Sequence, residues 1–467
     1  MNILQVSASD GGGGAHKIAL ALQMGLRERG HGSWMAVGRR TVENPNLYQI
    51  PSGIAPGPTR AVYEAAALAL TPLVGRVRGA RRARLALRSA HPLEYARARW
   101  SGREYFDYPG SRRILEIPPA RPDVVHLHNL HTEYFDLRSL ADLSSTVPVA
   151  LTLHDEWTYT GHCAYGIECE RWRVGCGACP DLTIYPSVRR DATHENWLAK
   201  RAIYEQSRLY VSAPSSWLLD RARESVLATA AADWRLIPNG VDLRVFRPAE
   251  KAHARELLGL PQQPLILLFA ANRARANRFK DYATIAAATD LVAAGLRNRN
   301  LLLIALGGEG PPQFLANGEL RAMPWEHEPA RVAAFYQAAD VYLHAANADT
   351  FPTTVLEALA TGTPVVATAV GGIDEQVRSL AGAPGAWSGA AFDADVATGV
   401  LVPPHDAAGM AAATIALLAN DALRAQLGAN AVRDAATRFG LAGQLDATLA
   451  WYADITRDWR AWRATSS

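Results

Sequence analysis

The chain has 467 residues, of which 49% are apolar and 20% are charged, and its formal net charge is +3. This length exceeds one ordinary hydrophobic core and suits two domains of a globular protein. The small net charge argues against nucleic acid as a partner. No apolar run approaches the ~18 residues of a transmembrane helix, and the first ten residues do not resemble a signal peptide, so we expect a cytoplasmic protein.

Short apolar runs alternate with helical patterns along most of the chain. A glycine-rich loop at residues 11–17 separates the first apolar run from a helical pattern at 18–30, which Gly30 ends. Strand patterns in the first half lie at 1–8, 123–130, 148–155 and 208–215. The series restarts after residue 235, with strand patterns at 235–242, 264–272, 300–310, 340–346, 363–372 and 399–406.

Alternating strands and helices indicate parallel sheets with crossover helices on both faces. Two such series predict two doubly wound, Rossmann-like α/β domains, at residues 1–230 and 231–440. We expect the helical segment at 441–467 to return to the first domain. The cleft between the two domains, at the carboxyl ends of the strands, is the expected ligand site.

Residues 59–113 interrupt the alternation with an arginine-rich insertion. Its arginines are Arg76, Arg78, Arg81, Arg82, Arg84, Arg88, Arg97 and Arg99. They fit a solvated helix face as well as they fit an amphipathic surface that binds anionic lipid headgroups. No nucleic-acid recognition motif accompanies them.

The glycine loop at 11–14 follows the first strand and opens the first helix. Bare amides at a helix N-terminus suit a phosphate, although a flexible turn explains the same glycines. A dinucleotide-binding fingerprint needs a further glycine where His16 stands and an acid after the second strand. Both are missing, so a nicotinamide-dependent dehydrogenase is disfavoured.

The stretch DTFPTTVLE places two acids on either side of a turn. Asp349 falls in a loop after a strand pattern, and Glu357 falls inside the following helix, which Gly362 ends. Thr353 and Thr354 lie near the helix start, where amides are free to bind an anion. A diphosphate between two hydroxyl-rich groups, as in a nucleotide sugar, fits this set. A helix cap at Asp349 and a solvated Glu357 are the plainer interpretation.

The stretch resembles the acid–seven residues–Glu signature of family-4 retaining glycosyltransferases, whose GT-B architecture has two facing Rossmann-like domains. Further matches occur in the family's order: the glycine loop, PDVVHLH, LTLHD, IPNGVD, a basic cluster ending in Lys280, GGEG, AADVYLHAA and VGGIDE. The stretch LHDEWTYTGHCAY resembles a subset that builds bacterial exopolysaccharides of the colanic-acid type.

For the donor side, the resemblance implies that Glu357 holds the ribose hydroxyls and that Asp349 contacts the donor sugar. It assigns Lys280 and Arg273 to the diphosphate. Arg275 and Arg278 compete for the arginine role, because the spacing to Lys280 departs from the family pattern. The family usually has Glu at position 349 and Gly at position 281, where this chain has Asp in both places.

For the other side, the resemblance places His154 near the donor sugar and the reacting centre. Gly12 and Gly13 are expected to approach the diphosphate, and Glu375 to support the nucleotide. His126 and His128 alternate along one strand, and we interpret them as structural.

The resemblance implies a retaining, metal-independent transfer of sugar from a nucleotide diphosphate donor to a glycan or lipid-linked acceptor, with no cofactor for catalysis. The protein is then cytoplasmic and acts at the inner face of the membrane if the arginine insertion binds lipid. A nucleotide-sugar epimerase or hydrolase of similar fold, and a non-catalytic nucleotide-sugar-binding subunit, stay open as alternatives.

All the cysteines of the chain lie in one short segment, at Cys163, Cys169, Cys176 and Cys179. Four thiolates can hold a structural zinc ion, although only one pair has the two-residue spacing typical of zinc sites. Two disulfides are disfavoured in the cytosol. Inert buried thiols are the remaining alternative, and we favour zinc.

Overall fold

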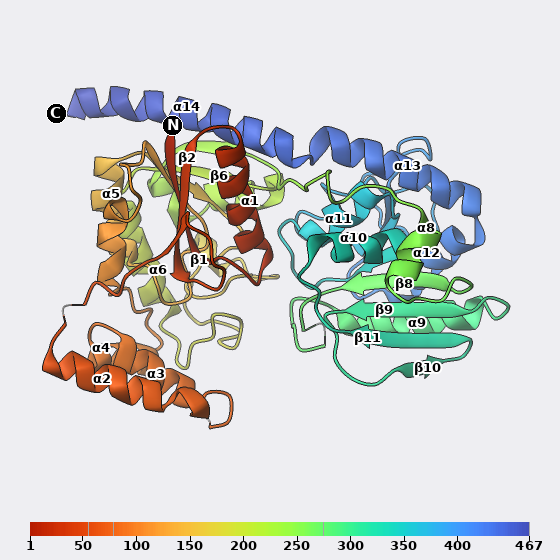
Figure 1. Cartoon of the computed structure of the whole chain (residues 1–467), viewed down its shortest axis with the longest axis horizontal. Helices are drawn as coiled ribbons and strands as arrows, with labels where there is room; N and C mark the ends of the chain where they lie inside the picture. Colours follow the sequence, from red (N-terminus) through yellow and green to blue (C-terminus); the bar gives the residue numbers. More distant parts are fainter. Residues whose placement is uncertain (55, 78, 274, 467) are drawn as a thin grey trace. The chain divides into compact units, whose positions relative to one another are not determined.

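The structure is a computed structural model that describes residues 1–54, 56–77, 79–273 and 275–466 (Figure 1). Arg78 of the arginine-rich insertion lies outside these residues. The chain forms two compact units. Unit 1 contains Met1–Pro214, Leu218–Leu236 and the chain from Ala447 onward, and unit 2 contains Ser215–Trp217 and Ile237–Asp446.

Unit 1 is built on a parallel sheet in the order β3-β2-β1-β4-β5-β6-β7. Its strands are β1 (Asn2–Ser9), β2 (Gly32–Arg39), β3 (Leu47–Gln49), β4 (Val124–Leu127), β5 (Val149–Thr152), β6 (Leu209–Ala213) and β7 (Ala231–Leu236). Strands β4, β5 and β6 are buried at every position, because helices cover a parallel sheet on both faces. Outside the arginine-rich insertion, the helices and short 3₁₀ turns of this unit are α1 (Gly14–Glu28), η3 (Leu137–Ser139), α5 (Leu140–Thr146), η4 (Arg171–Arg173), α6 (Thr193–Tyr204), α7 (Ser216–Arg223) and η5 (Val226–Thr229). The first two residues of α7, Ser216 and Trp217, belong to unit 2.

The arginine-rich insertion forms its own group of helices in unit 1. It contains α2 (Pro58–Ala69), η1 (Thr71–Leu73), α3 (Ala80–Arg88), α4 (Pro92–Ser101) and η2 (Pro109–Glu116). Proline opens both α2 and α4, where its missing N–H costs nothing, and the left-handed Gly102 ends α4. Figure 1 shows α2, α3 and α4 packed together beside the sheet-bearing part of this unit.

Unit 2 has a second sheet in the order β10-β11-β9-β8-β12-β13-β14, in which only the β10–β11 pair is antiparallel. Its strands are β8 (Leu265–Ala270), β9 (Leu301–Leu306), β10 (Gln313–Leu315), β11 (Gly318–Met323), β12 (Val341–His344), β13 (Val365–Thr368) and β14 (Gly399–Val402). Its helices are α8 (Lys251–Leu257), α9 (Tyr282–Gly295), α10 (Pro329–Ala338), α11 (Thr353–Thr361), α12 (Ala407–Ala419) and α13 (Asp421–Arg438). One core joins α10, α11 and α13 to the sheet and a second core joins α9 and α12, so both faces are covered.

Helix α14 (Leu441–Ser466) carries the chain from unit 2 back into unit 1. Trp451 and Tyr452 are fully buried there. The Tyr452 hydroxyl accepts a hydrogen bond from Gln5 Nε2 at 3.2 Å and lies 2.6 Å from His126 Nδ1. Asp458 accepts hydrogen bonds from Arg208 at 2.7 Å and from the Tyr210 hydroxyl at 2.6 Å. The helix therefore contributes both apolar and polar contacts to the sheet of unit 1.

The two doubly wound sheets confirm the predicted α/β fold class. None of the helices in the described part of the chain is both long and apolar enough to cross a bilayer.

We predict that Tyr452→Phe destabilises unit 1. The change removes the hydroxyl that serves Gln5 and His126, and leaves buried polar atoms without a partner at a cost of about 1–3 kcal/mol. Urea unfolding followed by circular dichroism measures this loss. Tyr48→Phe is the matched control, because Tyr48 is only half-buried and its hydroxyl bonds to none of the described residues. Equal stability of the two variants would contradict the prediction.

Candidate functional site

The sheet of unit 2 reverses its winding between β8 and β12. From β8 the chain proceeds to β9 on one side, and β12 then pairs with the other side of β8. Loops that leave the carboxyl ends of two such strands diverge and open a crevice, which is the usual ligand site of doubly wound sheets. The loop after β8 carries Lys280, and the loop after β12 carries Asp349.

Lys280 and Asp349 meet at this point as a hydrogen-bonded ion pair. Both side chains are largely buried, with 14% and 13% of their surface exposed. His344, the last residue of β12, lies 3.3 Å from Lys280 Nζ and 3.6 Å from Asp349 Oδ2 through its Nε2 atom. Burial opposes ionisation of Asp349, but the charge of Lys280 and contact with His344 outweigh it and hold the Asp349 pKa well below its usual range. The site therefore contains a fixed carboxylate next to a fixed ammonium group.

The backbone around Lys280 explains its fixed position. Lys280 forms an isolated antiparallel bridge with Ala346, and the Asp281 amide donates to the Ala345 carbonyl at 3.1 Å. The Asp281 carboxylate caps α9 by accepting from the Thr284 amide at 3.0 Å. An aspartate where the resembled family has glycine thus acts as a helix cap at this position.

Helix α11 begins four residues after Asp349. Its N-cap is Pro352, and no side chain caps its first turn, where Thr353 and Thr354 lie. The amides of a helix's first turn have no partner within the helix, and the helix dipole favours an anion there. The start of α11 is therefore suited to a phosphate group beside the Lys280–Asp349 pair.

Glu357 lies on α11 and is only 5% exposed. It accepts a hydrogen bond from the Tyr336 hydroxyl at 2.8 Å. The rings of Tyr336 and Tyr342 are in edge contact, with centroids 5.3 Å apart, and the Tyr342 hydroxyl lies 3.1 Å from His344 Nδ1. A continuous chain of side chains thus connects Glu357 with Lys280.

Sequence reasoning missed Tyr336, Tyr342 and His344. The signal for two of them was present, because Tyr342 and His344 are two residues apart on β12 and so lie on one face of the sheet. Burial lowers the His344 pKa to about 4, and the Lys280 charge adds to this effect. His344 is therefore a neutral hydrogen-bonding group at neutral pH.

The glycine pair after β13 packs against the same loop. Gly371 has a φ of 58°, and a Cβ atom there would lie 1.8 Å from the Asp349 carbonyl oxygen. Only glycine fits such a contact. Glu375, four residues later, accepts hydrogen bonds from the Ser216 and Trp217 amides at 2.8 Å each. Its carboxylate thus binds backbone at the start of α7, and its predicted role toward the nucleotide is untested.

The predicted diphosphate arginines lie in the exposed loop after β8. Arg273 is exposed and has a φ of 54°. The Arg275 guanidinium lies over the Tyr282 ring at 5.3 Å. Arg278 is also exposed, and its backbone carbonyl accepts from Asn347 at 2.8 Å. This geometry does not distinguish among the three arginines.

The sheet of unit 1 reverses its winding between β1 and β4, and the glycine loop follows β1. Gly12 has a φ of 106°, which a side chain would strain, and Gly13 is the N-cap of α1. A Cβ atom on Gly12 or Gly14 would meet nothing within 4 Å, so these glycines border open space. The predicted phosphate-binding loop is therefore unobstructed at the start of α1.

A buried histidine relay lies beneath this loop. His154, which is 9% exposed, hydrogen-bonds through Nε2 to His128 Nδ1 at 2.9 Å, and His128 Nε2 lies 2.8 Å from Gln5 Oε1. His126 instead contacts Tyr452 and Thr152, each at 2.6 Å. Burial lowers the pKa of His154 to about 4 and that of His126 to about 3.

The hydrogen-bond roles in the relay follow from these low pKa values. Neutral His128 uses Nε2–H to donate to the Gln5 carbonyl oxygen, so its Nδ1 atom accepts from Nε2–H of His154. The relay thus fixes the tautomer of His154. His126 and His128 support the structure, in the manner expected for them, while the role of His154 stays a prediction.

The four cysteines are free thiols and line one small cavity together with His162. The Cys179 Sγ atom lies 3.4 Å from His162 Nε2, and Cys176 Sγ accepts from the Gly161 amide at 3.2 Å. Burial raises the pKa of Cys163 to about 12 and that of Cys176 to about 11. Within the described ranges, no three His, Cys, Asp or Glu side chains are already arranged to hold a metal ion. The structure therefore gives the zinc prediction no direct support.

Residues 258–434 match the family model described as glycosyl transferases group 1. The chain is 27% identical over 269 residues to the colanic acid biosynthesis glycosyl transferase WcaC of Escherichia coli K12, covering 53% of this chain and 60% of WcaC. It is 36% identical over 233 residues to D-inositol 3-phosphate glycosyltransferase 1 of Catenulispora acidiphila, covering 46% of this chain and 50% of that protein. The chain spans about half the length of the curated relatives it matches.

Solved structures align over nearly the whole chain. Sucrose-phosphate synthase of Thermosynechococcus elongatus aligns with a TM-score of 0.60 at 18% identity, covering 98% of this chain and 100% of that one. Anabaena HepE in complex with UDP and glucose aligns with a TM-score of 0.57 at 13% identity, covering 97% and 99%. These neighbours show the two-domain GT-B fold, and residues 258–434 are a group 1 glycosyltransferase domain.

Proposed function

We propose that the protein, through its group 1 domain, is a retaining, metal-independent glycosyltransferase. It moves a sugar from a nucleotide diphosphate donor to a glycan or lipid-linked acceptor. The observation that carries the proposal is the Lys280–Asp349 pair at the winding reversal of unit 2, four residues before the start of α11. A cation, a helix N-terminus and buried hydroxyl-binding groups together match a sugar diphosphate.

The chemistry follows from where charge develops. Cleavage of the bond between the sugar and the phosphate leaves negative charge on the diphosphate and positive charge on the sugar. Lys280 and the first amides of α11 stabilise the leaving diphosphate, because fixed cations and dipoles act strongly in a site with little water. Asp349 neutralises Lys280 before the donor binds and is then able to accept from donor-sugar hydroxyls.

The ribose is assigned to Glu357. Its carboxylate is fixed by Tyr336 at 2.8 Å, so it accepts hydroxyl hydrogen bonds with little further ordering. The names of the relatives, which include glycosyltransferases acting on D-inositol 3-phosphate, and the UDP bound to HepE agree with a nucleotide-sugar donor. The similarity to WcaC suggests exopolysaccharide or envelope synthesis at the inner face of the membrane.

Two alternative functions use the same donor site. An epimerase or hydrolase would convert the nucleotide sugar without an acceptor, and a non-catalytic subunit would bind it without turnover. A transfer assay that follows both the donor and the sugar product distinguishes all three. The acceptor-dependent release of nucleoside diphosphate is expected only from the transferase.

We predict separable effects at the donor site. Glu357→Gln should weaken binding of free uridine or guanosine diphosphate about tenfold to a hundredfold, because it removes a charged hydrogen-bond acceptor. Asp349→Asn should retain nucleotide binding, because the Lys280 charge becomes available, and should abolish sugar transfer. Lys280→Ala should weaken binding of the diphosphate, and of the three variants it should lower the rate of sugar transfer most. Isothermal titration calorimetry and the transfer assay measure these effects.

Tyr336→Phe is the matched control for Glu357→Gln. It removes the hydrogen bond that Glu357 accepts from Tyr336 and leaves the carboxylate in place, so it should affect nucleotide binding less than Glu357→Gln. If Tyr336→Phe and Glu357→Gln have the same effect, Glu357 acts only in packing. Wild-type protein that binds neither nucleotide would overturn the donor site itself.

We propose that helices α2 and α4 attach the protein to anionic lipid. Leu68 is 73% exposed and Leu93 is 77% exposed, close in sequence to the exposed arginines Arg76 and Arg97. Exposed apolar side chains next to arginines are typical of helices that lie in a membrane interface. Apolar groups enter the interface while the arginines contact phosphate headgroups.

The attachment is tested by sedimentation with vesicles. Binding to phosphatidylserine vesicles should be strong at low salt and should fade at high salt, because added ions screen the arginines. Arg76→Gln/Arg97→Gln should weaken it. Equal binding to neutral phosphatidylcholine vesicles, or no binding to either, would contradict an electrostatic attachment.

We also propose that the cysteine cavity takes a structural zinc ion. The cavity holds about 20 Å³, room for one ion, and all four cysteines line it. Metal analysis of protein purified under reducing conditions should approach one zinc per chain. Cys176→Ser/Cys179→Ser should lose the zinc and unfold at a lower temperature. Metal-free protein of full thermal stability would exclude the proposal.

A further inference from the structure

A large cavity in unit 1 lies apart from the cysteines and the glycine loop. It has a volume of about 440 Å³, within the ~300–1,000 Å³ that small-molecule sites span. Its walls come from helices α3 and α4, from the segment 104–108, from the loops after β4 and β5, and from residues 185–188. The arginine-rich insertion therefore forms one wall of an open cavity against the carboxyl ends of β4 and β5.

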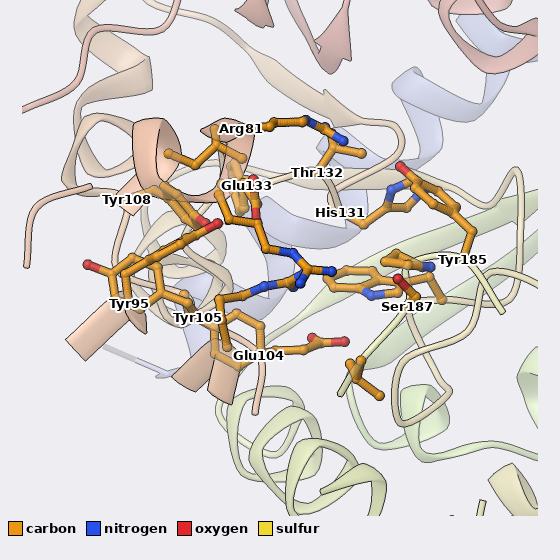
Figure 2. Close-up of a pocket in the computed structure, with 18 of the residues that line it drawn as sticks. Arg81, Tyr95, Glu104, Tyr105, Tyr108, His131, Thr132, Glu133, Tyr185 and Ser187 are labelled. Carbon is orange, nitrogen blue, oxygen red and sulfur yellow. The ribbon is translucent and has the colours of Figure 1, made fainter. Parts of the chain in front are cut away.

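Several aromatic side chains line the walls. They are Tyr95, Tyr105, Phe106, Tyr108, Phe135, Trp157 and Tyr185. Figure 2 shows Tyr95, Tyr105 and Tyr108 on one side of the pocket and Tyr185 on the opposite side. Tyrosine and tryptophan combine a flat apolar face with a polar edge, which suits a sugar, whose ring has an apolar C–H face and a rim of hydroxyls.

Each acid of the cavity accepts a hydrogen bond from a neighbouring side chain through one carboxylate oxygen. Glu104 accepts from Lys200 Nζ at 3.2 Å, and Lys200 is fully buried beneath the cavity. Glu133 accepts from the Tyr95 hydroxyl at 2.6 Å. These contacts hold the walls together and leave the acids less able to attract a cation.

The arginines of the cavity have no such partners. Arg81, Arg82 and Arg99 line it, and none of them makes a hydrogen bond or an ion pair with any described residue. A guanidinium group presents several N–H donors in a plane and matches the oxygens of a phosphate or carboxylate. The cavity therefore offers unused positive charge.

Three buried polar atoms of the lining also lack a partner among the described residues: Glu104 Oε2, the Tyr108 hydroxyl and His131 Nδ1. His131 is only 8% exposed and contacts Asp155 through Nε2 at 2.8 Å. Nε2–H donates to the Asp155 carboxylate, and Nδ1 is left to pair with a ligand. A buried polar atom without a partner is costly unless a ligand or water satisfies it.

The loop that carries His131 has a strained backbone. Thr132 and Glu133 are consecutive non-glycine residues with φ values of 82° and 68°. Such left-handed conformations cost energy and persist only where the surroundings enforce them. Here the Tyr95–Glu133 hydrogen bond connects the strained loop to helix α4.

We propose that this cavity binds the acceptor and that the acceptor is a sugar carrying an anionic group, a phosphate or a carboxylate. The assignment rests on the proposed transferase function, which requires an acceptor. The sugar ring packs on the aromatic walls, its hydroxyls pair with Tyr108 and His131, and its anionic group is bound by Arg81, Arg82 and Arg99. A neutral sugar would leave these guanidinium groups unused.

The test measures binding of soluble probes to the full chain, with uridine diphosphate added to occupy the donor site. The probes are glucose 1-phosphate, glucuronate, glucose and inorganic phosphate. Glucose 1-phosphate or glucuronate should bind at least about tenfold more tightly than glucose, because charged hydrogen bonds are added. Either should also bind more tightly than inorganic phosphate, which lacks the ring.

Variants of the arginines locate the binding. Arg81→Gln/Arg99→Gln should weaken binding of the charged sugar about tenfold or more and leave binding of glucose unchanged. Arg84→Gln/Arg88→Gln is the matched control, because both residues lie on α3 or at its end and neither lines the cavity. Tyr185→Ala should weaken binding of the charged sugar and of the neutral sugar to the same extent.

Several results would overturn the inference. It fails if no charged sugar binds, if the control pair weakens binding as much as the cavity pair, or if glucose binds as tightly as its phosphate. It also fails if Lys280→Ala removes the binding while Arg81→Gln/Arg99→Gln retains it, because the probe then occupies the donor site. Uridine diphosphate titrations of the same variants separate this failure from failure of the donor site, since nucleotide binding should depend on Glu357 and not on Arg81 or Arg99.

Discussion

The ion pair between Lys280 and Asp349 is the interaction on which the candidate donor site depends. It joins the loops after β8 and β12, at the place where the winding of the sheet reverses. Removing one partner of a largely buried pair leaves an uncompensated charge, at a cost of about 3–5 kcal/mol. The pair is therefore stable only while both residues are present, or while an anionic ligand takes the place of Asp349 beside Lys280. The same contact that holds the empty site together thus prepares it for a diphosphate.

The fold class was predictable because strands buried on both faces leave uninterrupted apolar runs, such as those of β8 and β9. The start of α11 was predictable from Pro352 and the following threonines, and its end from Gly362. The Lys280–Asp349 contact was not, because it joins positions 69 residues apart and depends on the register of β8 and β12. The contact of the Glu375 carboxylate with the amides of Ser216 and Trp217 was not predictable either, because it joins positions 159 and 158 residues apart.

The arginine-rich insertion shows why a charge pattern underdetermines function. The sequence does not distinguish among its arginines, which all fit a solvated or a lipid-binding helix face. In the structure Arg81, Arg82 and Arg99 line a cavity, whereas Arg84 and Arg88 do not. Arg81 and Arg84 are three residues apart, so helical spacing alone places them on nearly the same face of α3. The division arises because α3 and α4 pack against the loop that carries His131 and Glu133, which no local pattern predicts.

The position of Tyr452 on α14 has a consequence for synthesis on the ribosome. Gln5 and His126 belong to strands made early, but the hydroxyl they share is made only after all of Ile237–Asp446 has emerged. During translation the sheet of unit 1 therefore exposes the surface that Trp451 and Tyr452 later cover, while unit 2 already has every residue it needs. Domains of a growing chain generally fold in order from the N-terminus. In this chain the second unit is able to complete its fold before the first, and a nascent chain stalled after Asp446 would carry an unfinished N-terminal unit with an exposed apolar surface, which is a target for chaperones.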